Sequence, residues 1–267
     1  MFMIRLLYPG GKTKALTFSY DDGKIHDRRL VKLFNTHGLK ATFHLNSGLL
    51  EHPGTISRQE AASLYDGHEV ACHGVLHAFP SQLSNPALVR EFLDDRIALE
   101  QCTGRFITGL SYAYGDHSPE VRAAAHAAGL LYARTVRSTG KFFPPADFLQ
   151  WDPTCHHARA LDDAALTDAF LEAPGDTYPM LYYIWGHSYE FTDHDNWEVM
   201  ENFCRRMGGR EDIWYASNIE IVDYMEAAGR LQFGAGGDMV YNPSAASLWI
   251  EVDGGKREVK GGQLLRL

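Results

Sequence analysis

The chain of 267 residues is too long for a small protein held together by disulfides, and its composition of 45% hydrophobic and 22% charged residues excludes a disordered chain. Its 25 basic and 34 acidic residues give a formal net charge of −9, which argues against general binding to nucleic acid or to an anionic membrane. No apolar run approaches the roughly 18 residues of a membrane span. The N-terminal residues do not resemble a secretion signal, and the four cysteines show no CxxC spacing. We therefore expect a cytoplasmic protein with reduced thiols, and its oligomeric state stays open.

Short strand-like runs alternate with helical segments as far as residue 229. Hydrophobic periodicity and helix-capping signals, among them the capping boxes at Ser57–Glu60 and Ser217–Glu220, define the boundaries. Seven such units in succession predict a parallel sheet, open or closed into a barrel. The predicted strands cover residues 15–19, 40–45, 68–72, 107–113, 130–134, 180–185 and 213–216, and the predicted helices cover residues 27–37, 57–67, 85–104, 118–129, 162–172, 196–207 and 217–229.

The pattern changes after residue 230. Short alternating runs are separated there by Gly-rich turns, and Asp253-Gly254 is typical of a hairpin. We predict a barrel domain over residues 1–230 and a small antiparallel β appendage over residues 231–267 that packs on the barrel. These strands are more typical of packing than of a carbohydrate-binding module.

Polar and aromatic residues follow the carboxyl ends of several predicted strands, which is where functional residues gather in parallel α/β proteins. Because these strand ends share one rim, we expect their side chains to converge. The residues are Asp21 and Asp22 after the first strand, His73 and His77 after the third, Tyr114 after the fourth, and His187, Tyr189 and Glu190 after the sixth.

Each of these motifs carries little information alone. Thirteen histidines produce a pair four residues apart about 0.6 times per chain by chance, and Asp21-Asp22-Gly23 is also typical of an ordinary turn. Together, one aspartate and two histidines suit Zn²⁺, Fe²⁺, Ni²⁺ or Co²⁺. His73 and His77 can reach one ion if their segment forms a helical turn. Adjacent aspartates diverge along an extended backbone, so that one can bind the ion while the other acts as a base.

These residues resemble the polysaccharide deacetylase family, carbohydrate esterase family 4 with the NodB-type homology domain. Four segments carry the resemblance over roughly residues 15–190: Thr17–Gly23, His73–His77, Ser111–Gly115 and Ile184–His187. The resemblance implies a distorted (β/α)7 barrel, which agrees with the number of predicted strands. It also implies Asp21 as catalytic base, Asp22, His73 and His77 as ligands of one divalent metal ion, and His187 as general acid.

The implied reaction is metal-dependent hydrolysis of acetyl groups on an N-acetylated or O-acetylated saccharide. The cation, most simply zinc with nickel, cobalt or iron as other options, would activate the attacking water and polarise the carbonyl. A backbone N–H near Tyr114 would stabilise the oxyanion, and His187 would protonate the leaving nitrogen. Tyr114, Trp185 and Tyr189 are candidates for stacking on the sugar.

Two departures from the family pattern mark a variant subfamily. The third motif usually begins with an arginine that pairs with the catalytic aspartate, and Ser111 stands there instead. Arg134 and Arg137, after the fifth predicted strand, are candidates to replace it. The fourth motif is matched only loosely by Trp151–Pro153, and Cys155-His156-His157 beside it is not part of the pattern.

The functions of several further residues stay open. His156 is a candidate partner of the catalytic groups, although a surface or loop position for the His156–His157 pair is the simpler expectation. We expect Cys155 to be an inert thiol and Trp151 to pack in the core. The missing arginine leaves a non-catalytic carbohydrate-binding barrel as one alternative, and an amidohydrolase acting on a non-sugar C–N bond as another.

Overall fold

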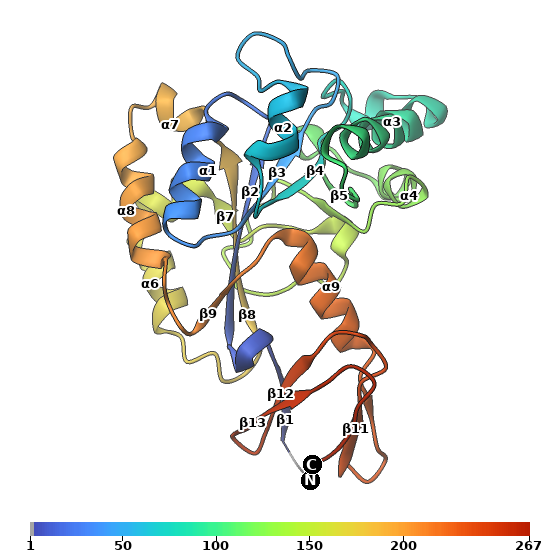
Figure 1. Ribbon diagram of the computed structural model, residues 1–267, viewed down its shortest axis with the longest axis vertical. Helices are drawn as coiled ribbons and strands as arrows, with labels where there is room; N and C mark the ends of the chain where they lie inside the picture. Colours follow the sequence, from blue (N-terminus) through green and yellow to red (C-terminus); the bar gives the residue numbers. More distant parts are fainter. Residues whose placement is uncertain (1–2) are drawn as a thin grey trace.

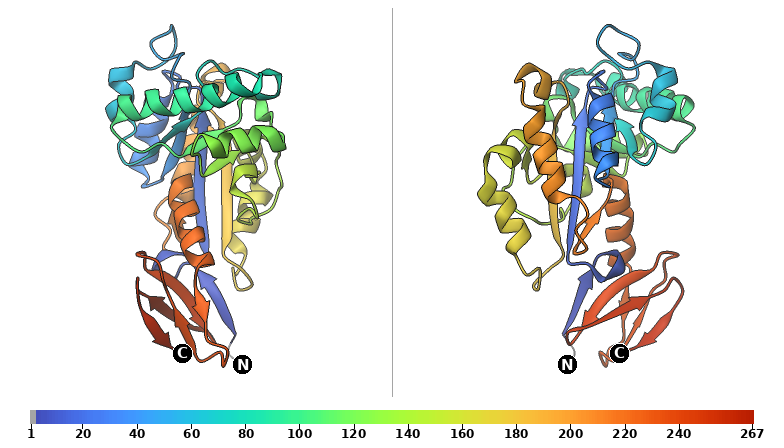
Figure 2. Two further views of the ribbon diagram at one scale, coloured as in Figure 1. Left: turned by 90° about the vertical axis from the view of Figure 1, so that its right-hand side faces the viewer. Right: turned by 60° about the vertical axis from the view of Figure 1, so that its left-hand side comes forward.

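A computed structural model describes residues 3–267 of the chain. Its larger part is a strongly curved parallel sheet surrounded by helices, and a smaller antiparallel β part lies at one end, beside both termini (Figure 1). In the side views the long strands β2 and β8 lie between the helices, with their N-terminal ends nearest this smaller part (Figure 2). The predicted α/β fold with an antiparallel appendage is therefore confirmed, and the parallel sheet is a curled half-barrel.

The parallel sheet is arranged around its first strand. The strand order is β6-β5-β4-β3-β2-β8-β7. The strand β9 also pairs with β2, at residues 14–16, which precede the residues of β2 that pair with β3. All these pairs are parallel, so the carboxyl ends of the strands meet on one rim. The strands are β2 (Lys14–Asp21), β3 (Ala41–Leu45), β4 (Glu69–Cys72), β5 (Gly109–Ser111), β6 (Tyr132–Arg134), β7 (Cys155–His156), β8 (Met180–His187) and β9 (Ile213–Tyr215).

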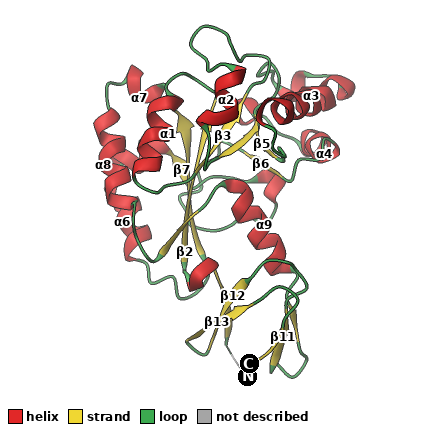
Figure 3. Ribbon diagram, in the orientation of Figure 1, coloured by secondary structure: helices red, strands yellow, loops and turns green. Residues whose placement is uncertain are grey.

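Helices follow the strands along the chain and cover the outside of the sheet (Figure 3). The predicted caps form as expected: the Ser57 side chain accepts the backbone N–H of Glu60, and Ser217 and Glu220 complete a capping box. The helices are α1 (Asp27–Thr36), α2 (Arg58–Leu64), α3 (Asn85–Thr103), α4 (Pro119–Ala127), α5 (His157–Asp162), α6 (Ala164–Glu172), α7 (Glu190–Asp193), α8 (Trp197–Met207) and α9 (Asn218–Gly229), with 3-10 turns at Pro9–Gly11, Pro80–Gln82, Ala113–Gly115 and Phe148–Gln150.

The two faces of β2 differ in polarity, because successive side chains of a strand point to opposite sides. Phe18 and Tyr20 pack with Phe34 of α1 in the apolar core beneath the helices. Ser19, which lies between them, is also buried, but it faces the inside of the half-barrel and accepts a hydrogen bond from Arg134. Asp21 follows Ser19 on this inner face and ends the strand at the rim.

The appendage consists of two three-stranded antiparallel sheets around Val240, Ile250 and Val259. The N-terminal strand β1, which was not predicted from the sequence, pairs with β12. The division of the chain at residue 230 remains a prediction. Between residues 3 and 267, no helix is long and apolar enough to cross a membrane. The strands are β1 (Ile4–Leu7), β10 (Gln232–Phe233), β11 (Met239–Tyr241), β12 (Leu248–Val252), β13 (Gly255–Val259) and β14 (Leu264–Arg266).

Several predicted boundaries differ from the structure, and two short elements were not predicted. The strand predicted over residues 107–113 is limited to Gly109–Ser111, because the chain turns into a 3-10 helix directly after Tyr112. The helix predicted from residue 162 begins at Ala164, with Asp163 as its N-cap. Residues 155–162 contain the short strand β7 and helix α5, which are too short to produce a hydrophobic period.

Candidate active site

The carboxyl-end rim of the sheet surrounds a cavity of about 560 Å³. Five elements or the loops that follow them contribute to its wall: β2, β4, β5, β6 and β8. Eight predicted site residues and two neighbours line it: Asp21, Asp22, His73, His77, Tyr112, Tyr114, Val136, Trp185, His187 and Tyr189.

Asp22, His73 and His77 form a group that fits one metal ion. The Asp22 Oδ1 atom lies 3.6 Å from His73 Nε2 and 3.7 Å from His77 Nε2. Two metal–ligand bonds of about 2.1 Å at tetrahedral or slightly wider angles separate their donor atoms by about 3.4–3.6 Å. The three donors are too far apart to hydrogen bond with one another, and their separations match those of ligands around an ion.

The path of the backbone to this group differs from the prediction. The segment from His73 to His77 is an irregular loop, so the helical turn that would have let the two histidines share an ion does not form. Asp22 and His77 have positive φ angles of 78° and 56°, a conformation that non-glycine residues rarely adopt. The strained backbone, and not helical spacing, brings the two side chains together, and strain of this kind is concentrated at functional sites.

Hydrogen bonds orient His73 towards the cavity. Its Nδ1 atom lies 2.8 Å from the backbone carbonyl oxygen of Ser111, an acceptor that requires the proton on Nδ1. Nε2 therefore carries the lone pair and faces Asp22 and His77. A ligand histidine in a metal site is commonly held by such a bond from its other nitrogen.

Asp21 lies beside this group and is held by Arg134 and Ser111. The fully buried Arg134 donates to Asp21 Oδ2, and the hydroxyl of Ser111 donates to Oδ1 over 3.1 Å. Burial alone would raise the pKa of Asp21, but the Arg134 guanidinium and the nearby His73 hold this pKa well below its usual range. Asp21 is therefore ionised at all ordinary pH values.

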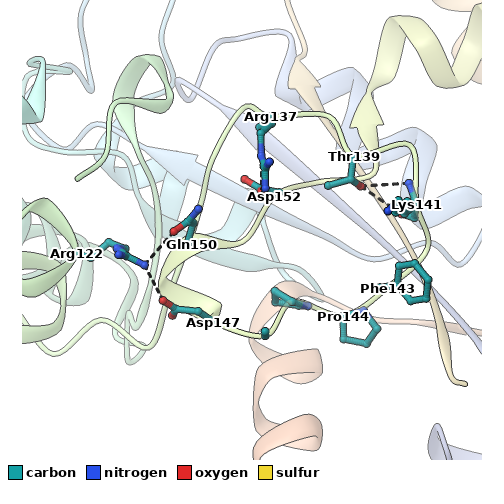
Figure 4. A pocket seen from close by; sticks show the side chains of 11 residues that line it. Arg122, Arg137, Thr139, Lys141, Phe143, Pro144, Asp147, Gln150 and Asp152 are labelled. Carbon is teal, nitrogen blue, oxygen red and sulfur yellow. Dashed lines mark hydrogen bonds and ion pairs between the residues drawn. The ribbon is translucent and has the colours of Figure 1, made fainter. Parts of the chain in front are cut away.

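Of the two arginines proposed to replace the missing cation, only Arg134 reaches Asp21. Arg137 is exposed and pairs with Asp152 at the edge of a separate cavity (Figure 4). Arg122 pairs with Asp147 across the same cavity, so two of its cations already have acidic partners.

His187, at the end of β8, is bound to Glu190 of α7. The His187 Nδ1 atom lies 2.7 Å from Glu190 Oε1, and the ring lines the cavity. Burial opposes protonation of His187, but the hydrogen bond to Glu190 and the charges of Asp21 and Asp22 raise its pKa above the ordinary value. The bond to Glu190 and the nearby carboxylates thus favour the protonated form of His187 at the cavity wall.

Glu190 also holds His156 and His157, which the sequence analysis placed on a surface or loop. Its Oε2 atom lies 3.2 Å from His156 Nε2 and 2.9 Å from His157 Nε2. His157 is buried against β8, where a Cβ atom on Gly186 would lie 2.1 Å from His157 Nδ1. The expectation of a surface pair was wrong for His157, because glycine at position 186 opens the space for its ring.

A second group of metal-ligand type therefore exists at His156, His157 and Glu190, but it is more compact than the first. Its nitrogen–oxygen separations of 2.9 and 3.2 Å are those of hydrogen bonds. Together with the bond from His187, three imidazoles share one carboxylate. These distances favour shared protons, whereas the wider spacing around Asp22 favours an ion.

Neighbouring side chains cover part of the aromatic rings at the rim. The Tyr114 ring stacks on Phe79 with centroids 3.8 Å apart, and His77 approaches it at 4.5 Å. The Trp185 ring is covered by the Arg134 guanidinium, 4.4 Å from its centroid. Tyr189 lines the cavity beside His187.

Two expectations about neighbouring residues outside the cavity are confirmed. Trp151 is fully buried and packs against Tyr132 and Tyr183. Cys155 is buried, and burial raises the pKa of its thiol to about 11, which leaves it inert as a nucleophile.

The sequence analysis missed the central position of Glu190 and the dual contact of Ser111. The spacing of three residues between His187 and Glu190 could have predicted their contact, because side chains three residues apart meet where a helix begins. Nothing in the local sequence marks Ser111 as a partner of both Asp21 and His73, since the three residues come from different strands or loops.

The sequence matches one protein family. Residues 9–133 fit the family model described as polysaccharide deacetylase. Among curated proteins no significant match is found.

Solved structures of the same kind share the fold at low sequence identity. A polysaccharide deacetylase of Mycobacterium smegmatis, described as putative, superposes with a TM-score of 0.64 at 18% identity, over 84% of this chain and 94% of that one. The PuuE allantoinase gives a TM-score of 0.65 at 16% identity, over 81% and 91% of the two chains. A protein of Bacillus anthracis described as a CE4 family pseudoenzyme gives 0.53 at 15% identity, over 82% and 68%.

The alignment is only partial for other deacetylases. This chain spans 44% of the length of the deacetylase structures from Bacillus anthracis and Bacillus cereus. The matching segment nevertheless contains the acidic pair of β2, both histidines after β4 and the third motif. The resemblance to the polysaccharide deacetylase family is thus confirmed, by its sequence pattern over residues 9–133 and by a fold shared with its solved structures.

Proposed function

We propose that the protein is a metal-dependent hydrolase that removes acetyl groups from N-acetylated or O-acetylated saccharides. The observation that carries this proposal is the arrangement of three parts around one cavity. They are the ligand group of Asp22, His73 and His77, the ion pair of Asp21 with Arg134, and the pair of His187 with Glu190.

The ligand group supports one divalent cation, for which zinc suits two imidazoles and a carboxylate best, while nickel, cobalt and iron also accept this set. When bound, such an ion would polarise an acetyl carbonyl and lower the pKa of a water molecule. The cation would lie beside Asp21, since His73 Nε2 is 3.7 Å from Asp21 Oδ2 and 3.6 Å from Asp22 Oδ1.

The protein's own groups would manage the protons. Asp21, kept ionised by Arg134, accepts the proton of the attacking water. The backbone N–H of Tyr114 is a candidate donor to the developing oxyanion. His187 holds a proton on the cavity side while Glu190 fixes its other nitrogen, and it transfers that proton to the leaving nitrogen or oxygen.

Two further functions stay open from the comparisons. The Bacillus anthracis structure described as a pseudoenzyme supports a non-catalytic barrel, and the allantoinase supports hydrolysis of a non-sugar C–N bond. The absence of an arginine from the third motif favours the non-catalytic barrel. Arg134 weighs against it, because the base retains a buried cationic partner from another strand.

The decisive experiment measures acetate release from saccharides, and ring opening of allantoin, by the zinc-loaded protein. The substrates are N-acetylated chitooligosaccharides, an O-acetylated xylooligosaccharide and allantoin. The proposal predicts acetate from at least one saccharide, and loss of the activity in Asp22→Asn. A ring-opened product from allantoin, without acetate from any saccharide, would support the amidohydrolase, and no hydrolysis of any substrate would support the non-catalytic barrel.

A further inference from the structure

The loop from His73 to His77 carries two of the three residues that fit a metal ion, but it has little of its own to hold its shape. It forms no helical turn, and the side chain of Leu76 is 62% exposed, so it does not anchor the loop in the core. His77 has a positive φ angle of 56°. Such a conformation costs free energy at a histidine and persists only where contacts to other parts of the chain enforce it.

Asp95 of helix α3 fixes the first half of this loop. The helix packs against β4, the strand that leads into the loop. The fully buried Asp95 carboxylate accepts the backbone N–H groups of His73 and Gly74 at Oδ2, each over 3.0 Å. On the other side, the Asn46 amide donates to the carbonyl oxygens of the same two residues. The start of the loop is therefore held from both directions, by α3 and by the end of β3.

Glu91 holds the second half of the loop. It lies one helical turn before Asp95, and residues four apart share one face of a helix. Glu91 Oε1 accepts the backbone N–H of Leu76 over 2.9 Å, directly before His77. Glycine at position 74 leaves room for this contact, because a Cβ atom there would lie 2.8 Å from Glu91 Oε1.

The bond between Leu76 and Glu91 controls how the chain approaches His77. The His77 Nε2 atom lies 3.7 Å from Asp22 Oδ1, a separation that depends on the strained backbone just after this bond. Glu91 is not among the residues that line the cavity, so it acts on the metal group only through the loop. Residues that orient metal ligands through hydrogen bonds commonly change metal affinity by about 10–100-fold.

We propose that Glu91 is a positioning residue of the metal group, which raises metal affinity by holding the loop in the conformation that presents His77. This inference rests on the proposed function, because it takes Asp22, His73 and His77 as ligands of an ion. The hydrogen bond, and not the negative charge, does this work. A glutamine at position 91 has an amide oxygen at the same place and can accept the same N–H group.

Zinc affinity tests this inference without a measurement of catalysis. Competition with a chromophoric zinc chelator gives the Kd of the unmodified protein and of three variants. In Glu91→Ala, zinc binds at least about tenfold more weakly. Glu91→Gln, which keeps the acceptor, stays within about threefold of the unmodified protein. Asp94→Ala also stays within this range and is the matched control, because Asp94 is an exposed acid on the same helix and its removal takes away the same charge.

Equal affinity in Glu91→Ala and the unmodified protein overturns the inference. An equal loss in Glu91→Gln or in Asp94→Ala also overturns it, because the charge would then be the cause. Thermal unfolding of the metal-free proteins separates positioning from a general structural role. Glu91→Ala unfolds at the temperature of the unmodified protein, and a large decrease there overturns the inference.

The proposed function is tested separately by acetate release from the zinc-saturated, unmodified protein. A zinc affinity that depends on Glu91 as described, without acetate release, supports the inference and contradicts the proposed hydrolysis. Acetate release together with an unchanged zinc affinity in Glu91→Ala does the reverse. Undetectable zinc binding by the unmodified protein overturns the inference.

Discussion

The guanidinium of Arg134 donates to the carboxylate of Asp21 inside the half-barrel, although 113 positions separate the two residues. Both side chains are buried, and Ser19 accepts a second bond from Arg134. The cation that the family usually places in the third motif, at the end of β5, thus comes from β6, which is the next strand along the chain and the neighbour of β5 in the sheet. Ser111 occupies the vacated position and holds Asp21 and His73.

Removal of Arg134 should disable Asp21, the proposed base. In Arg134→Met the carboxylate of Asp21 stays buried without its partner, and loss of one member of a buried ion pair costs about 3–5 kcal/mol of stability. Arg134 lowers the pKa of Asp21, so its removal raises that pKa and moves the acidic limb of the activity profile to higher pH. We expect kcat/KM to fall roughly 100-fold. Arg137→Met, at an exposed pair with Asp152, is the control, and an equal loss there would contradict this assignment.

The pair of His187 and Glu190 should set the alkaline limb. Burial lowers the pKa of His187 and the bond to Glu190 raises it, with a net increase. Replacing Glu190 by Gln lowers that pKa, so His187 loses its proton at lower pH and the alkaline limb moves down. A pH profile of kcat measures this shift. An unchanged profile with reduced kcat at every pH would show that Glu190 only supports the structure.

Metal binding should involve one ion per chain. The Asp22 group has the spacing of metal ligands, and the Glu190 group has the spacing of hydrogen bonds. Elemental analysis after zinc loading should therefore find one equivalent in the unmodified protein and in His156→Asn, and less than a tenth in His77→Asn. Two equivalents, of which His156→Asn loses one, would refute the distinction between the two groups.

Two buried acids should make the fold less stable as pH rises. Burial raises the pKa of both Asp27 and Glu69 to about 7. The hydrogen bonds that each carboxyl group accepts lower the pKa, but they offset only part of this increase. A raised pKa in the folded state means that their contribution to stability is complete below about pH 4 and is lost as pH rises through 7. The free energy of unfolding in urea should decrease between pH 5 and pH 8, by less in Asp27→Asn than in the unmodified protein. An equal decrease in both would exclude Asp27 as a cause.

The rim could be predicted from the sequence, because strand ends of a parallel sheet meet regardless of loop detail. Asp21, Asp22, His73, His77 and His187 all line one cavity, as their positions after strands indicated. The conformation that unites them could not be predicted. His77 reaches the group through a left-handed backbone conformation, for which local sequence gives no signal at a histidine.

Long-range partners were the least predictable part of the site. Arg134 and Arg137 were both candidates to replace the missing arginine. The pairing of β5 with β6 places Arg134 beside Asp21, whereas Arg137 pairs with Asp152. His157 looked like a loop residue because the short elements β7 and α5 have no period. The N-terminal strand β1 was missed since its partner β12 lies at the other end of the chain.

The dependence of acetate release on bound zinc tests the central claim most directly. Metal-free protein is titrated with zinc, and the rate of acetate release from tetra-N-acetylchitotetraose is measured at each ratio. The account predicts no rate without metal, a linear increase that ends at one ion per chain, and no activity in His77→Asn at any ratio. A full rate in the metal-free protein, or no acetate at one equivalent of zinc or of nickel, cobalt or iron, would contradict it.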